Sequence, residues 1–478
     1  MEPLNIDGAN TAFVMVCAFL VLLMTPGLAF FYGGMSRSKN VLNMIMMSFS
    51  AIAVVTVLWV VVGYALTFGE DKGGLIGWSS GLVGLRDLMN NATFGLVAGN
   101  EAAAEAAGVD SFVTNTYGLP DLVFAGFQLM FAVITVALIS GAVADRLKFG
   151  SWLVFTAVWA TVIYFPVAHW VFAFGVAEEG GQAAGFANGF FAADTGGWIV
   201  NRLGAFDLAG GTAVHINAGA AALALILVLG KRKGFGKEAM RPHNLPLVML
   251  GTGLLWFGWF GFNVGSTLGA TAYSGVVLIN TQVATAAAVL GWLVVEKLRD
   301  GHMTTLGAAS GAVAGLVAIT PACGFVNGFG AIAIGVAAGV LCALAVTLKH
   351  KLGYDDALDV IGVHLVGGLV GTLMIGLVGD ATHTLTDTVV DGGSFGLLGT
   401  QAVAAFAVLG YSFVGTLVIA LLLKVTIGLR VSPEEEALGL DQVTHAETAY
   451  EMSAALGAGG ASQGAGALAT ATLPKVSS

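Results

Sequence analysis

Charged residues are scarce in this chain. They make up 10% of its 478 residues, against about 25% in a typical soluble domain, while 57% of the residues are hydrophobic. So few charges cannot cover a soluble globule, which excludes a soluble protein and predicts an integral membrane protein. The formal net charge of -10 arises mainly from loops and the C-terminal segment, and its distribution predicts no nucleic acid partner.

Cysteine is also scarce. Cys17, Cys323 and Cys342 are too scattered for a disulfide framework or a cysteine metal site, so we expect them to be small buried apolar side chains. Glycine, by contrast, is abundant at 69 residues, and runs such as Gly307-x3-Gly311-x3-Gly315 permit close helix packing in a membrane. The composition therefore predicts an all-α bundle of closely packed membrane helices.

Eleven apolar stretches each approach the roughly 20 residues that a helix needs to cross a bilayer. They cover residues 9–32, 41–67, 120–142, 150–174, 206–229, 246–266, 275–296, 304–320, 327–348, 358–378 and 396–424. The loops on one side would carry 15 Lys and Arg residues and those on the other side 3, so the positive-inside rule places the N-terminus outside and the C-terminus in the cytoplasm. The first stretch lacks a basic flank and a cleavage site, and we interpret it as a retained span.

An Asp-x7-His element occurs twice, as Asp207 with His215 in the fifth stretch and as Asp356 with His364 in the tenth. The two copies divide the chain into repeats of five spans, about 9–229 and 246–378, followed by one extra helix at about 396–424. Because five is odd, the repeats must be inverted, and inverted repeats place a substrate path at their interface near the midplane.

The two histidines are predicted to meet. Eight helical residues rise about 12 Å, so each imidazole lies about 12 Å into the membrane, from opposite sides. A hydrocarbon core of about 30 Å then leaves about 6 Å between them. Ionisable groups at such a depth are typical of a transport path or a proton relay. The alternative is that each histidine only forms a hydrogen bond to a neighbouring helix.

The residues around His215 carry a family resemblance. The segment Asp207-Leu-Ala-Gly-Gly-Thr-Ala-Val-His215-Ile-Asn-Ala-Gly219 resembles the signature of the ammonium transporter family, which includes the Amt, Mep and Rhesus proteins. Four further motifs match in order along nearly the whole chain: Phe30-Phe31-Tyr32-Gly33-Gly34, Gly258-Trp259-Phe260-Gly261-Phe262-Asn263, Thr320-Pro321-Ala322-Cys323-Gly324 and Asp359-Val-Ile-Gly-Val-His364. The resemblance implies eleven helices and a homotrimer in which each subunit has its own pore.

The resemblance also implies roles for single residues. An outer ammonium site falls on Phe131, Trp159 and Ser266, since aromatic faces attract cations and a hydroxyl oxygen accepts a hydrogen bond from ammonium. Phe131 and Phe262 would form a stacked gate above His215 and His364, which would hold ammonia or relay a proton. The remaining implied residues line the path (Phe31, Tyr32, Trp259, Phe127 and Gln128) or support it (Asp207, Ser310 and Asp359).

These residue types also have plainer interpretations. Aromatic residues in membrane spans often only pack or face lipid. Asp207 is also a suitable N-cap for the fifth span, and the aspartates at the start of the tenth span, Asp355, Asp356 and Asp359, are compatible with ordinary N-terminal helix charges.

Desolvation limits the mechanism. Moving an isolated ammonium ion into an apolar pore costs on the order of tens of kcal/mol, whereas a cation–π contact returns about 2. We therefore expect ammonium, with methylammonium as its analogue, to lose its proton at the outer site, so that ammonia passes the gate while the histidines relay the proton and transport is electrogenic.

Other classes of protein remain open. A Rhesus-like channel for neutral ammonia and an ammonium sensor fit the same motifs. A membrane metalloenzyme is disfavoured, because a catalytic site would need a third protein ligand beside the paired histidines. We expect no enzymatic activity, no metal and no other cofactor.

The chain changes character after the last span. We predict a membrane domain over residues 1–427, a cytoplasmic regulatory tail over 428–452 and an Ala/Gly/Ser-rich end over 453–478. The tail resembles the family's cytoplasmic segment, which helps to dock a PII signalling protein of the GlnK type; the alternative is a merely solvated charged tail. The predicted location is the bacterial plasma membrane, as a multi-pass protein in the lipid bilayer.

Overall fold

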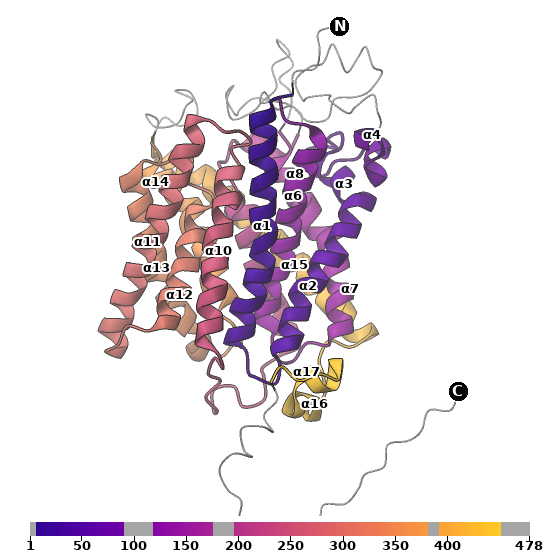
Figure 1. Ribbon diagram of the computed structural model, residues 1–478, viewed down its shortest axis with the longest axis vertical. Coiled ribbons are helices and arrows are strands. Elements are labelled where there is room, and N and C mark those ends of the chain that lie inside the picture. Colours follow the sequence, from indigo (N-terminus) through magenta and orange to yellow (C-terminus); the bar gives the residue numbers. More distant parts are fainter. Residues whose placement is uncertain (1–5, 90–117, 175–195, 381–391, 451–478) are drawn as a thin grey trace, which may run out of the picture.

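The computed structural model describes residues 6–89, 118–174, 196–380 and 392–450, and all extended elements in it are helical. Extended strands do not occur in these ranges, which contain only two isolated bridges, Asp71 with Gly77 and Leu147 with Arg430. Figure 1 shows a bundle of long helices, with the start of α1 at one end and the last two helices, α16 and α17, at the other. We call these ends the N-terminal face and the tail face.

The first half of the bundle contains the elements up to α9. Their bounds are α1 (Gly8–Met35), α2 (Val41–Leu58), η1 (Trp59–Gly63), α3 (Tyr64–Phe68), η2 (Ser80–Leu85), α4 (Arg86–Met89), α6 (Asp121–Ile139), η3 (Ser140–Val143), α7 (Phe149–Trp159), η4 (Ala160–Tyr164), α8 (Phe165–Phe172), η5 (Trp198–Leu203), η6 (Gly211–Ile216) and α9 (Asn217–Leu229). The η segments are short turns of 3-10 or π type, and several of them join two helices into one span.

The second half contains the remaining elements. They are α10 (Leu245–Gly265), α11 (Ala272–Asp300), α12 (Thr305–Ile319), α13 (Gly328–Leu352), η7 (Ile361–Leu365), α14 (Val366–Val378), α15 (Phe395–Thr426), α16 (Pro433–Leu438) and α17 (Leu440–His445). The last two are short helices of the tail, and α16 begins with a capping box formed by Ser432 and Glu435.

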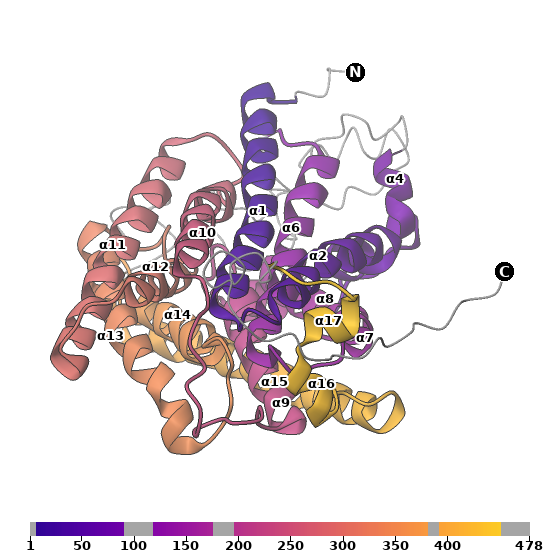
Figure 2. The same cartoon turned by 60° about the horizontal axis from the view of Figure 1, so that its bottom comes forward.

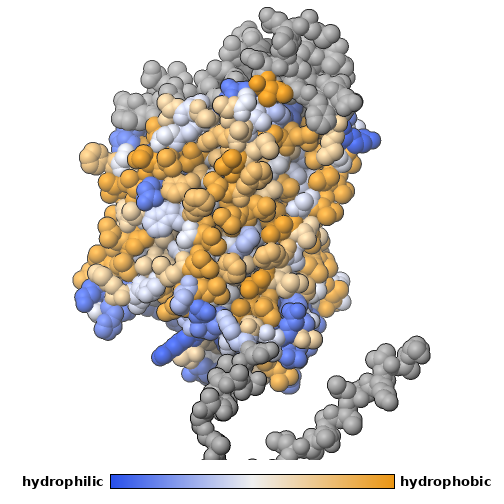
Figure 3. Space-filling view, viewed as in Figure 1, coloured by the Kyte–Doolittle hydropathy of each residue, from blue (hydrophilic) through white to orange (hydrophobic). Residues whose placement is uncertain are grey.

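Ten helical stretches among the described residues are long and apolar enough to cross a membrane. They match ten of the eleven predicted spans. The predicted eighth span, 304–320, is the helix α12, which has only 15 residues and is therefore shorter than the usual crossing length. Figure 3 shows an apolar belt around the middle of the bundle and hydrophilic residues toward both ends, as a multi-pass membrane protein requires.

Both histidine spans begin with a π turn capped by an aspartate. The Asp207 carboxylate accepts hydrogen bonds from the backbone N–H groups of Gly210, Gly211 and Thr212, although the N-cap residue itself is Gly210. The Asp356 carboxylate accepts from Val360 and Ile361 in the same way. Each aspartate satisfies N–H groups that a buried helix start would otherwise leave without acceptors.

Two equivalent glycines let these spans touch. Gly219 and Gly368 each follow their own histidine by four residues. A Cβ on Gly219 would lie 2.6 Å from the backbone of Leu365, and one on Gly368 would lie 3.0 Å from the carbonyl oxygen of Gly211. Since side chains would separate the segments, glycine at both places permits the backbone contact that brings the histidines together.

A buried ionic cluster closes the tail face. The Arg232 guanidinium binds the Asp355 carboxylate at 2.8 Å and the Asp145 carboxylate at 3.3 Å. Burial raises the pKa of Asp355, but the hydrogen bonds and charges of Arg232 and Arg146 outweigh this and leave the pKa below its ordinary value. The cluster joins three loops that lie far apart in the sequence.

The tail is attached to this cluster. The Asp441 carboxylate accepts from the N–H groups of Leu42 and Asn43 at 3.0 and 2.8 Å and so caps the start of α2. The Asn40 side chain accepts from the N–H of Leu440 and donates to Asp145. Figure 2, in which the tail face comes forward, shows α16 and α17 lying over that face. The described part of the predicted tail, up to residue 450, is therefore packed on the bundle, whereas 453–478 lies outside the described residues.

Candidate functional site

His215 and His364 form the centre of the candidate site. Their Nδ1 atoms are 3.2 Å apart and their ring centroids 5.3 Å apart, and both side chains are buried. The prediction that two imidazoles meet across the bundle is confirmed. Because two nitrogens in contact need one donor and one acceptor, the pair shares a proton between the rings. The His215 Nε2 atom is buried and has no hydrogen-bond partner in the structure.

Aromatic rings cover the histidine pair on the side of the N-terminal face. Phe131 and Phe262 stack with centroids 4.2 Å apart, as predicted for a gate, and Phe262 lies 6.1 Å from His215. Trp259 lies almost parallel to His215, at 5.4 Å and 17°. Phe127 packs edge-on against Phe131 at 4.9 Å. These rings are buried together with the imidazoles.

A small pocket adjoins Phe131, and neither histidine belongs to its lining. It holds about 10 Å³, close to the volume that one water-sized centre needs. Its lining includes the predicted residues Phe131, Ser266 and Gln128, together with Phe172, Phe174, Leu208 and Leu268. The Ser266 hydroxyl donates to the Phe262 carbonyl oxygen at 2.8 Å, so its own oxygen keeps acceptor capacity.

The structure does not bring Trp159 to this pocket. Trp159 ends α7 in the middle of the fourth span, where its indole N–H donates to the Thr416 hydroxyl at 2.9 Å and its ring stacks on Phe155. Phe172, thirteen residues further and therefore about 20 Å along the same span, lines the pocket and lies 6.4 Å from Phe131. Phe172 therefore occupies the place beside Phe131 that the sequence analysis gave to Trp159, and its role in binding an ion stays a prediction.

The residues predicted to line the path from α1 are buried away from this pocket. Phe31 and Tyr32 pack against each other at 5.8 Å, and the Tyr32 hydroxyl donates to the Leu138 carbonyl oxygen at 3.0 Å. Ser310 is buried within α12. Their places are compatible with a path toward the tail face, and their roles stay predictions.

The aspartates that precede His364 differ in their partners. Asp359 binds the Lys349 ammonium group and has a positive φ of 64°, which is strained for a residue other than glycine. Burial, followed by the charge of Asp359, raises the pKa of Asp356 to about 6. Asp355 belongs to the ionic cluster with Arg232. Asp356 is thus a helix cap, whereas Asp355 and Asp359 are ion-pair partners.

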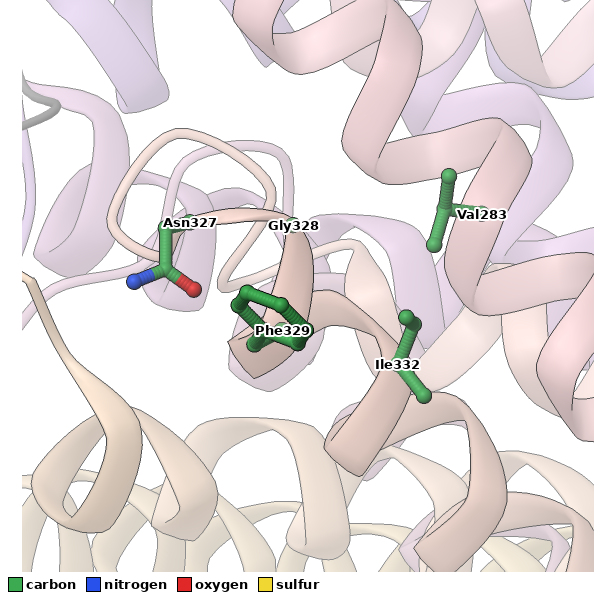
Figure 4. A pocket seen from close by; sticks show the side chains of 5 residues that line it. All are labelled: Val283, Asn327, Gly328, Phe329 and Ile332. Carbon is green, nitrogen blue, oxygen red and sulfur yellow. The ribbon is translucent and has the colours of Figure 1, made fainter.

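A larger cavity lies elsewhere. It holds about 520 Å³ and is lined by Val283, Asn327, Gly328, Phe329 and Ile332 on α11 and at the start of α13, as Figure 4 shows. Its lining contains no ionisable side chain. Among the described residues, no group of three or more His, Cys, Asp or Glu side chains could hold a metal ion. The histidine pair and its aromatic cover are therefore the better candidate site.

The fold and the site define a class, a multi-pass helical membrane protein whose paired histidines lie inside the bundle below a stacked pair of phenylalanines. The comparisons then give the family. Residues 12–450 match the model of the Ammonium Transporter Family. A protein of Mycobacterium tuberculosis named Ammonium transporter is 57% identical over 462 residues, which cover 94% of this chain and 92% of that protein. The chain belongs to the ammonium transporter family.

Solved structures agree with this membership. The Candida albicans Mep2 structure superposes with a TM-score of 0.75 at 32% identity and covers 90% of this chain and 88% of its own. A structure named Sensor Amt Protein has a TM-score of 0.76 at 30% identity and covers 91% of this chain and 97% of its own. The family resemblance read from the five motifs is thereby confirmed.

Proposed function

We propose that this protein transports ammonium across the membrane by binding the ion at the Phe131 pocket and passing ammonia and a proton separately beyond the phenylalanine pair. The observation that carries the proposal is the contact between His215 and His364 below Phe131 and Phe262. Two buried imidazoles that share a proton can relay a proton. The phenylalanine rings above them disfavour passage of an intact ammonium ion.

The outer pocket suits a small cation with N–H donors. Phe131 and Phe172 present two ring surfaces, and a cation–π contact contributes about 1–2 kcal/mol when it is desolvated. The Ser266 oxygen accepts a hydrogen bond because its own hydrogen is engaged by the Phe262 carbonyl oxygen. Ammonium satisfies both features. Sodium and potassium have no N–H donor for the Ser266 oxygen. They also have no proton to lose, so they cannot pass the phenylalanine pair as neutral molecules.

The stacked phenylalanines favour loss of the proton. An isolated charge in an apolar passage costs tens of kcal/mol by Born estimates, far more than the pocket returns. Ammonia passes as a neutral molecule, and the partnerless Nε2 of His215 is placed to bind it or to take up a proton. The shared proton at the two Nδ1 atoms then continues the route toward His364 and the tail face. Transport by this route is electrogenic.

Two alternatives use the same site. A Rhesus-like channel would pass neutral ammonia without moving charge. A sensor is the second, because a solved neighbour at 30% identity is named Sensor Amt Protein. Net current separates both from the transporter, since neither alternative moves charge continuously.

The wider assignment follows from the same family. We propose that residues 1–427 form the membrane domain, with inverted repeats of about 9–229 and 246–378 and an extra helix of about 396–424, in a homotrimer of the bacterial plasma membrane. The matching aspartate caps and the glycines Gly219 and Gly368 support the repeat. The protein acts as a transporter and not as an enzyme, its N-terminal face is external, and α12 is the eighth of eleven spans.

We also propose a regulatory role for the tail over residues 428–452. Its described part is joined to the start of α2 through Asp441, and through Asn40 to Asp145 in the ionic cluster. A PII protein of the GlnK type that binds the tail face would therefore act on the loop that precedes His364. Binding of such a protein to purified, full-length transporter tests this part.

The central proposal is tested with proteoliposomes on a solid-supported membrane. An ammonium concentration jump should give a current, and a potassium jump should not. Changing His215→Ala and His364→Ala singly and together should abolish the ammonium current, with the double variant costing far less than the sum of the singles. Strictly additive effects, with ammonium current and selectivity kept, would reduce the pair to packing residues.

A further inference from the structure

A second polar site lies near the start of α6, outside the histidine path. The Oδ1 atom of Asp121, in the first turn of α6, and the hydroxyl of Tyr64, the first residue of α3, are both buried and have no hydrogen-bond partner. Ring contacts connect the two regions, because Tyr64 packs on Phe68 and Phe68 packs on Phe124, which lies three residues after Asp121. Buried polar groups are rarely left without partners, so this pair requires an explanation.

The surroundings of the pair are aromatic. Tyr64 contacts Trp59 at 5.8 Å and Phe68 at 5.4 Å, and Phe68 contacts Phe124 at 5.0 Å. Phe124 lies one turn after Asp121 on α6, and the next residue, Ala125, accepts the indole N–H of Trp59 at 3.1 Å. These contacts connect Tyr64 to the first turns of α6, where Asp121 lies, so the two unpaired oxygens flank one aromatic cluster.

The backbone is irregular at the same place. Four π turns lie within the membrane spans of the described residues: η1, η4, η6 and η7. The turns η6 and η7 hold the two histidines. The other two meet in this cluster, because Trp59 begins η1 and lies 5.6 Å from Phe165, the residue that follows η4. Since π turns in helices are frequent at functional sites, this convergence agrees with a second site.

We propose that Asp121 and Tyr64 form an accessory binding site for ammonium or methylammonium at the start of α6. The Oδ1 atom of the Asp121 carboxylate is buried without a partner, and removing a charged oxygen from water costs free energy. A bound cation offsets this cost because it neutralises the charge, which a water molecule does not do. Ammonium donates one hydrogen bond to the Asp121 carboxylate and one to the Tyr64 oxygen, and its remaining charge faces the rings.

The position of the site suits a role in supplying ammonium to the Phe131 pocket. Asp121 precedes Phe131 on α6 by ten residues, about 15 Å toward the N-terminal face. An ion held there is near the entrance to the Phe131 pocket, so the site raises the local supply of ammonium. This role rests on the proposed transport function, whereas binding itself does not.

Infrared difference spectroscopy on the purified full-length protein tests the binding. At pH 7, replacing sodium by ammonium should shift a carboxylate band, and the shift should be absent in Asp121→Asn and reduced in Tyr64→Phe. Two results would overturn the proposal: no ammonium-dependent carboxylate change, or a protonated carboxyl band that disappears in Asp121→Asn. The second result would show that Asp121 is neutral and simply holds its own proton.

Transport in proteoliposomes provides the second measurement. Asp121→Asn should raise the half-saturating ammonium concentration by roughly tenfold while the maximal current is kept, and Asp121→Glu should restore much of the loss. Glu70→Gln is the matched control, because it removes the same charge from an exposed side chain on the same face. An Asp121→Asn half-saturation equal to wild type overturns the accessory site. If Ser266→Ala still weakens uptake in that case, the proposed function survives and only this inference fails.

Discussion

The indole N–H of Trp259 donates to the hydroxyl of Thr320 at 2.8 Å, and that hydroxyl in turn donates to the Leu316 carbonyl oxygen at 2.7 Å. The two bonds fix the plane of the indole, which lies 5.4 Å from His215 and nearly parallel to it. Thr320 belongs to the Thr-Pro-Ala-Cys-Gly motif but does not touch either imidazole ring in this chain of contacts. It therefore acts on His215 through Trp259.

Thr320→Val should impair transport. Valine has the shape of threonine but leaves the buried Trp259 N–H without an acceptor, which costs about 1–3 kcal/mol and frees the indole to turn. We expect the ammonium-jump current to fall by roughly five- to tenfold at equal protein incorporation. Thr320→Ser keeps the hydroxyl and should retain most of the current. Equal currents in the valine variant and the wild type would show that Thr320 has no role in positioning His215.

Phe172, and not Trp159, should determine the apparent affinity. Phe172→Leu keeps an apolar side chain and removes the ring quadrupole, which is worth up to about 2 kcal/mol, so half-saturation should shift by roughly one to one and a half decades. Phe172→Trp keeps the aromatic face and should stay near wild type. Trp159→Phe is the control and should leave the affinity unchanged, since the indole contacts Thr416 instead of the pocket. The opposite pattern would reinstate Trp159 at the outer site.

The sequence predicted the central geometry but not the depth of every side chain. The spacing of Asp207 to His215 and of Asp356 to His364 fixes an axial distance, because the rise of a helix is constant, and the two imidazoles do meet. The same reasoning fails for an aromatic ring in a span that contains many. Trp159 and Phe172 lie about 20 Å apart along one span, and only packing shows which of them faces Phe131. Phe172 is the last residue of its span, at the N-terminal face. Counting residues from that end of the span would have shown that Phe172, and not Trp159, lies at the depth of the outer site.

Three other features were beyond the sequence for physical reasons. The π turns depend on where a helix must widen to present a side chain, and no residue preference marks η6 or η7. The membrane-spanning character of α12 is ambiguous because its glycines allow a short helix to be buried between longer neighbours. The pairing of Arg232 with Asp355 joins residues separated by 123 positions, and a charge pattern does not determine such a partner.

Truncating the tail should separate its two predicted parts. Deleting 453–478 should leave transport and assembly intact, because a segment of that composition buries little apolar surface. Deleting from Gly428 onward removes the acceptor carboxylate that caps α2 and should impair transport and abolish binding of any PII protein. Asp441→Asn is a more specific variant, because it should weaken only the cap at the start of α2 and leave the rest of the tail in place. If the short deletion is as harmful as the long one, the boundary near residue 452 is wrong.

Acid should loosen the tail face through Asp355. The pKa of its carboxyl is below the ordinary value in the folded protein, so the stability that it contributes is complete above the unfolded pKa of about 3.9 and is lost as the pH falls through the folded value. The contribution of Asp355 should therefore be constant from pH 7 to about 5, and detergent-purified protein should melt at lower temperatures below about pH 4.

Asp355→Asn should remove this acid dependence and lower stability at pH 7 by on the order of 3–5 kcal/mol, because the buried Arg232 loses the nearer of its two carboxylate partners. Asp300→Asn removes an exposed carboxylate that pairs with Arg299 and serves as the control, with no expected change in melting. An identical acid limb in wild type and Asp355→Asn would assign the effect to another group.

Arg146 has a consequence for biogenesis. Its guanidinium donates to the carbonyl oxygens of Ala144, Gly230 and Asp355, and although burial lowers its pKa to about 10 it stays charged at neutral pH. The last of these acceptors is synthesised 209 residues after Arg146 itself. During translation the arginine must remain in water or with a temporary partner until nine predicted spans have followed one another into the bilayer. A ribosome that stops before residue 355 would therefore leave an incomplete bundle in which the Arg146 guanidinium lacks one of its three carbonyl acceptors.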